Sequence, residues 1–124
     1  MNYIAVTNTI NRNPILVERC LQALLSQKIK PSKVFLIDQN ENEIRLSNQI
    51  VANPIFQRNK VNFKSVSSAR NSIQIPDDVE WIFFCDDDGY ACEDYSEILN
   101  DLIVKNPDIE IFAGSIIRED TLEY

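Results

Sequence analysis

Short apolar runs alternate with amphipathic stretches along the whole chain. The apolar runs have the length of strands, whereas the stretches between them repeat apolar residues at the three- and four-residue spacing of a helix face. This alternation is typical of βαβ units and a mostly parallel sheet. We therefore predict an α/β fold, a Rossmann-like three-layer sandwich with a mostly parallel sheet, in a single domain over residues 1–124.

The pattern predicts five strands, of which the run after Glu80 is the most apolar and is expected to be central. The predicted strands are Tyr3–Thr7, Val34–Ile37, Val61–Phe63, Trp81–Cys85 and Ile109–Ala113. Four helices are predicted between them: from Pro14 to about Gln27, from about Glu43 to Val51, a short one at Ser67–Asn71, and one marked by Tyr95, Ile98, Leu99, Leu102 and Ile103. Asn13 is the expected N-cap of the first helix, with Pro14 at its first position, and either Ser67 or Ser68 is expected to cap the third.

Composition narrows the classes of function. The chain has 124 residues, 44% of them hydrophobic and 25% charged, with a formal net charge of −7. No apolar run reaches the roughly 18 residues of a membrane span, and no targeting segment is recognisable, so we expect a cytoplasmic protein. The negative charge disfavours nucleic acid as a partner. A phosphate-bearing ligand would need a divalent cation or a well-placed arginine to overcome the repulsion.

The chain contains no histidine and three cysteines. Without histidine, the commonest general base and the Ser-His and Cys-His nucleophile pairs are absent. No CxxC spacing occurs, which argues against a zinc site. Cys20 and Cys85 fall on a predicted helix and strand, where the usual interpretation is a small buried hydrophobe.

Polar residues follow the predicted strands where an open α/β sheet binds its ligands. They are Thr7, Asn8, Thr9, Asn11 and Arg12 after the first strand, Asp38 after the second, and Asp86, Asp87 and Asp88 after the fourth. Three adjacent carboxylates repel one another unless a cation offsets the repulsion, and hard oxygen ligands select Mg²⁺ or Mn²⁺. The alternative interpretation is a solvated acidic turn.

Arg70 and Asp38 are further candidates. Arg70 lies near the start of a short predicted helix, where backbone N–H groups favour anions, but it could equally be a surface arginine paired with a carboxylate. Asp38 could accept from a ribose or a base, or it could be an acid in a turn.

Five segments, in order, resemble the family 2 glycosyltransferases, which have a GT-A fold. The segments are Thr9–Arg12 followed by Pro14, the helix Leu21–Gln27, the strand Phe35–Asp38, the Ser68–Asn71 stretch, and Trp81–Asp88 with its continuation to Asp94. The last resembles the family's strand and DxD motif. The resemblance covers nearly the whole chain.

The resemblance implies a nucleotide-diphosphate sugar as ligand and Mg²⁺ or Mn²⁺ as cofactor. The residues it implies for binding the nucleotide-sugar are Thr9, Asn11, Asp38, Arg70, Asp86 and Asp87, and for the metal Asp86 and Asp88. It also implies sugar transfer, usually with inversion, to an acceptor that could be a saccharide or a lipid-linked molecule.

Three positions depart from the family pattern: Gln39–Asn42 replaces its Asp-x-x-Ser continuation, Ser68 stands where glycine is frequent, and Ala91-Cys92 stands where proline is common. The catalytic base of such enzymes lies well downstream of the DxD, and no residue here can be named for that role. The chain is then either the donor-binding half of a longer enzyme or a module that binds a nucleotide-sugar without transferring it. A phosphoacceptor receiver domain is disfavoured, because Thr7-Asn8-Thr9 stands where that architecture needs acids.

Overall fold

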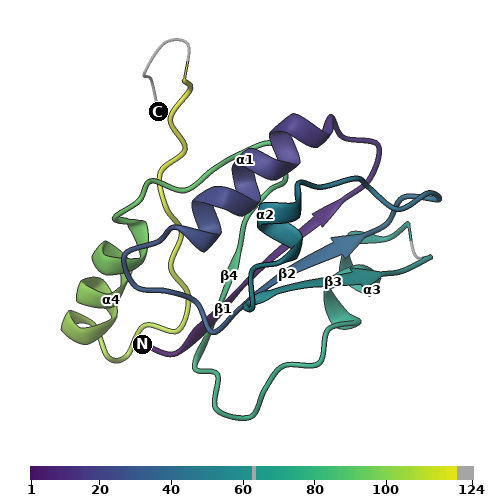
Figure 1. Ribbon diagram of the computed structural model, residues 1–124. Helices are drawn as coiled ribbons and strands as arrows, with labels where there is room; N and C mark the ends of the chain where they lie inside the picture. Colours follow the sequence, from purple (N-terminus) through teal and green to yellow (C-terminus); the bar gives the residue numbers. More distant parts are fainter. Residues whose placement is uncertain (63, 120–124) are drawn as a thin grey trace.

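The computed structural model describes residues 1–62 and 64–119. Its centre is a four-stranded parallel sheet in the order β3-β2-β1-β4 (Figure 1). The strands are β1 (Tyr3–Thr9), β2 (Lys33–Asp38), β3 (Phe56–Lys60) and β4 (Trp81–Phe84). The helices are α1 (Pro14–Leu25), α2 (Asn48–Val51), α3 (Val66–Asn71) and α4 (Tyr95–Lys105). The predicted α/β class with a parallel sheet is therefore confirmed.

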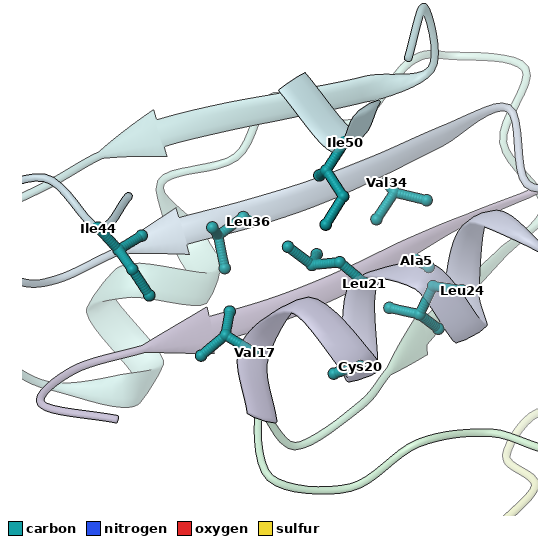
Figure 2. Packing of buried hydrophobic residues seen from close by; sticks show 9 residues of the cluster. All are labelled: Ala5, Val17, Cys20, Leu21, Leu24, Val34, Leu36, Ile44 and Ile50. Atoms are coloured by element: carbon teal, nitrogen blue, oxygen red, sulfur yellow. The ribbon is translucent and has the colours of Figure 1, made fainter. Parts of the chain in front are cut away.

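The two middle strands carry the core because both of their faces are covered. On one face, Ala5, Val34 and Leu36 pack against the buried side of α1 and against Ile50 of α2 (Figure 2). On the other face, a second cluster contains Ala69 of α3; its members are Ile4, Val6, Phe35, Ile37, Ala69 and Ile73. Successive residues of a strand point to opposite faces, so unbroken apolar runs in β1 and β2 feed both clusters.

The strand at Trp81 is an edge strand among the described residues, not the central strand that its apolar composition predicted. β1 is central, between β2 and β4, and it is buried through nearly its whole length, whereas β4 is only half-buried. The apolar side chains of β4 are partly covered by the chain that follows α4. The rings of Trp81 and Phe112 lie 5.6 Å apart, and this segment runs past β4 in Figure 1.

The predicted fifth strand, Ile109–Ala113, is not a strand in the structure. Ile109 and Ile111 are exposed, and the contact of this segment with β4 is made through side chains. No ladder of backbone hydrogen bonds joins the two segments within the described part of the chain.

Three other predicted boundaries are wrong. The helix expected from Glu43 is confined to α2, and the third strand is β3, several residues before the predicted Val61–Phe63, of which Phe63 lies outside the described residues. The cap of α3 is Ser65, whose side chain accepts from the N–H of Ser68, rather than Ser67 or Ser68. At α1 the prediction holds: the Asn13 side chain accepts from the N–H of Ile15, and Pro14 is the first residue.

None of the helices described in the structure is long and apolar enough to span a membrane.

Candidate functional site

Thr9 and Asp87 join the ends of two neighbouring strands. Thr9 is the last residue of β1, and Asp87 lies in the loop after β4. The Thr9 hydroxyl donates to Asp87 Oδ2 at 2.8 Å, and the two residues are 1% and 8% exposed. A buried carboxylate costs much free energy unless it is hydrogen-bonded and its charge is offset. Asp87 is therefore the one aspartate of the three that turns into the protein, and it fixes the loop against β1.

Arg12 supplies the opposite charge. Its Nε lies 3.2 Å from Asp87 Oδ1, and its Nη2 lies 3.7 Å from Asp88 Oδ2. The hydrogen bond to Asp87, followed by the attraction of Asp87, Asp88 and Asp86, raises the pKa of the Arg12 guanidinium. Asn11, just before it, has a φ of 52°, a left-handed conformation that asparagine tolerates better than most residues. This turn brings Arg12 back over residues Asp86–Asp88, which we call the acidic loop.

Asp38 is beside Thr9, since the two residues are partners in the parallel register of β1 and β2. It is fully buried, and its carboxylate accepts from its own loop: Oδ1 from the backbone and side-chain N–H groups of Asn40 at 3.0 and 2.8 Å, and Oδ2 from the N–H of Ile44 at 2.9 Å. Asn40 in turn accepts from the N–H of Asn11 at 2.7 Å. Asp38 thus shapes the loop at this edge, and its direct contact with a nucleotide stays a prediction.

Asp86 and Asp88 are exposed, in contrast to Asp87. Among the described residues, no group of three or more acidic or cysteine side chains is close enough to hold a metal ion by itself. Mg²⁺ in phosphate-binding sites is commonly held by one or two carboxylates, with waters and substrate phosphates completing its shell. The exposed carboxylates of Asp86 and Asp88 fit a site of that kind, in which the metal and the phosphate ligand bind together.

Arg70 lies in α3, and its guanidinium carbon is 4.6 Å from the centre of the Phe84 ring, at the end of β4. Its Nε is buried and has no hydrogen-bond partner within the described residues. A cation stacked on an aromatic ring keeps its charge available to an anion in the plane of the guanidinium. The structure does not bring Arg70 into contact with the three aspartates.

Beneath the loop lie two cysteines. The Sγ atoms of Cys20 and Cys85 are 3.7 Å apart. The hydrogen bond between them, followed by burial, raises the pKa of Cys20, and the same hydrogen bond lowers the pKa of Cys85. The prediction that Cys20 is a buried small side chain is confirmed, while Cys85 is partly exposed.

The sequence itself matches no protein-family model and no curated protein. Solved structures do match. One is S. aureus TarS 1-349, at a TM-score of 0.62 and 15% identity over 96% of this chain and 40% of that one. A second S. aureus TarS structure matches at a TM-score of 0.62 and 16% identity, over 96% of this chain and 23% of that one.

The fold is α/β and Rossmann-like, and the two TarS structures share it. At such low identity the likeness concerns the fold alone. The chain spans less than half the length of either TarS chain.

The structure brings Thr9, Asp38, Asn11 and the acidic loop to one edge of the sheet, as their positions at the carboxyl ends of the predicted strands indicated. The sequence interpretation gave no role to Arg12, although it is the closest cation to Asp87. The available signal was a single arginine in the turn after the first strand, in an acidic chain. It also missed the ring of Phe84 as the support of Arg70, and nothing in the sequence spacing indicates that contact.

Proposed function

We propose that this chain binds a nucleotide-diphosphate sugar together with Mg²⁺ or Mn²⁺, as the donor-binding half of a glycosyltransferase. The observation that carries the proposal is the meeting of the acidic loop with the ends of β1 and β2, through the Thr9–Asp87 hydrogen bond and the Thr9–Asp38 register. Ligands of open α/β sheets bind at this edge, beyond the carboxyl ends of the strands. The GT-A-like fold supports the same ligand class.

The proposal divides the aspartates by their exposure. Asp86 and Asp88, which are exposed, would hold the metal, and Asp86 would also lie close to the ribose. Asp87 accepts hydrogen bonds from Thr9 and Arg12, and these bonds fix the acidic loop next to the proposed place of the ribose. The metal, when bound, supplies a Lewis acid that stabilises the charge of the leaving nucleoside diphosphate.

The remaining residues bind the nucleoside and the phosphates. The base and the ribose would lie beside Thr9, Asn11 and Asp38. Asn11 and Asp38 act partly through the loop after β2, to which both are hydrogen-bonded. Arg70 provides a positive charge for the diphosphate, because it forms no ion pair with any described residue. In a chain with a net charge of −7, an anionic ligand depends on this arginine and on the metal.

Calorimetry tests the binding step. UDP, GDP and dTDP are titrated into the protein, each with Mn²⁺ and with EDTA. We expect one of the three to bind with Mn²⁺ at least about tenfold more tightly than without it, which corresponds to about 1.4 kcal/mol. Binding of none of them, or binding that is indifferent to the metal, would contradict the proposal.

A pair of matched variants assigns the effect to the loop. Asp88→Ala removes a proposed metal ligand, whereas Asp101→Ala removes an exposed acid of α4. We expect Asp88→Ala to abolish the metal-dependent part of binding and Asp101→Ala to leave it unchanged, with both variants folded by circular dichroism. Equal behaviour of the two variants would contradict the assignment.

Sugar transfer is the second step of the proposal. The family resemblance implies transfer with inversion as the usual outcome, and no residue of this chain is assigned as the base. The chain spans 40% and 23% of the two TarS chains, so the acceptor half would come from a polypeptide segment other than these 124 residues. The same observation favours a second candidate, a nucleotide-sugar-binding module without turnover. Release of nucleoside diphosphate from the sugar donor, measured with and without saccharide and lipid-linked acceptors, separates the two functions.

A further inference from the structure

Cys20 and Cys85 meet although 64 residues of sequence separate them. Cys20 belongs to α1, and Cys85 is the first residue after β4. Their Sγ atoms are 3.7 Å apart. Figure 2 shows Cys20 at the margin of the cluster that α1 buries against the sheet.

Both sulfur atoms also contact the backbone of the acidic loop. The carbonyl oxygen of Asp86 lies 3.4 Å from Cys20 Sγ and 3.7 Å from Cys85 Sγ. The thiol pair is thus in contact with the backbone of the first aspartate. A change in the state of the sulfurs therefore acts directly on the position of this loop.

The two sulfurs need little movement to bond. A disulfide has an S–S distance of about 2.05 Å, so they must approach by about 1.7 Å, which side-chain rotation and a small shift of the loop can provide. The third cysteine, Cys92, is exposed and belongs to a different segment.

We propose that Cys20 and Cys85 are a site of reversible oxidation, at which an intramolecular disulfide ties the acidic loop to α1. The oxidant is a small disulfide such as oxidised glutathione. Cys85 is partly exposed, so its thiolate attacks the oxidant first, forming a mixed disulfide and releasing one glutathione thiol. The Cys20 sulfur then attacks the Cys85 sulfur, loses its proton to the departing glutathione thiolate, and so releases the second glutathione thiol. Two protein thiols are oxidised and one glutathione disulfide is reduced, and the two protons of the protein thiols end on the two glutathione thiols.

The disulfide has two structural consequences. It closes a long loop of chain and so restricts the unfolded state more than the folded one. It also removes both S–H groups, so that the Asp86 carbonyl loses its sulfur donors. The inference is independent of what the acidic loop binds.

The test uses a Cys92→Ser variant, which leaves only the proposed pair. The folded protein is equilibrated with oxidised glutathione, quenched with acid, unfolded and alkylated. It is then digested, and the masses of its peptides are measured by mass spectrometry. We expect loss of both alkylatable thiols, a cross-linked peptide that contains Cys20 and Cys85, and a melting temperature raised by about 5 °C or more. Dithiothreitol should reverse all three changes.

Single-cysteine controls show whether the partner matters. Cys20→Ala and Cys85→Ala, each combined with Cys92→Ser, should gain at most one glutathione and show no such rise in melting temperature. Circular dichroism verifies that each variant is folded before oxidation.

Two results would overturn the inference. One is a folded Cys92→Ser protein in which both thiols stay free or Cys85 stops as a glutathione adduct. The other is a disulfide that forms faster in urea than in buffer, since the folded arrangement would then not promote it.

Discussion

The hydroxyl of Thr9 and the carboxylate of Asp87 are both buried, and Thr9 donates to one oxygen of that carboxylate while Arg12 donates to the other. Thr9→Val keeps the shape of the side chain and leaves the carboxylate short of one donor. We expect the free energy of unfolding to fall by about 1–3 kcal/mol, measured by urea denaturation. Thr9→Ser keeps the hydroxyl and should lose clearly less. A Val variant as stable as the wild type would mean that Asp87 is held by Arg12 alone.

Asp38 can be tested in the same way. Its two oxygens accept three hydrogen bonds from Asn40 and Ile44, and Asp38→Asn places an amide donor where one acceptor is needed. We expect a loss of about 2 kcal/mol in urea denaturation. Glu41→Gln, an exposed neighbour in the same loop, should change stability by less than about 0.5 kcal/mol. Unchanged stability together with lost nucleotide binding would show instead that Asp38 acts only on the ligand.

At the scale of residues, the sequence predicts which side chains lie at the ligand-binding edge of the sheet, but not which of their atoms are in contact. The end of an apolar run marks the end of a strand, so Thr9, Asp38 and the acidic loop were predictable as neighbours at one edge. The contacts of Arg12 with Asp87 span 75 residues of sequence and depend on the left-handed turn at Asn11. No spacing rule contains that information.

At the scale of elements, α1 was predicted well because its signals are local. An apolar stripe, a capping asparagine and a proline at the first position all lie within the helix or next to it. Asn13→Ala should lower the free energy of unfolding by about 1 kcal/mol, because the N–H of Ile15 loses its acceptor. Asn13→Ser should retain most of the stability in the same urea experiment. A cap that contributes nothing would leave the two variants indistinguishable.

The second helix was mispredicted because tertiary contacts override the local pattern. The N–H of Ile44 donates to Asp38, and that of Ser47 donates to Glu18 on α1. These contacts hold the chain before Asn48 in an irregular path, so only α2 remains helical. β3 was missed because its local pattern is not apolar. Its residues Gln57–Asn59 are polar, which a strand at the edge of the described sheet tolerates.

At the scale of the whole molecule, the net negative charge has opposite effects on the two proposed ligands. The net charge of −7 attracts a divalent cation and repels a free diphosphate. The Debye length falls from about 30 Å at 0.01 M salt to about 8 Å at 0.15 M, so the long-range part of both effects is lost over this range. The contacts of Asp86 and Asp88 with a metal act over short distances and are screened much less.

Titrations of the proposed metal site at these two salt concentrations therefore separate the two contributions. We expect Mn²⁺ to bind about two- to fivefold more weakly at 0.15 M KCl than at 0.01 M, as the attraction of the remote carboxylates is screened. Metal-free binding of the nucleoside diphosphate should strengthen over the same range, because the repulsion is screened too. The opposite signs are the diagnostic result. If both affinities fell together, the attraction of local cations such as Arg70 would outweigh the repulsion of the acidic surface, which would contradict this prediction.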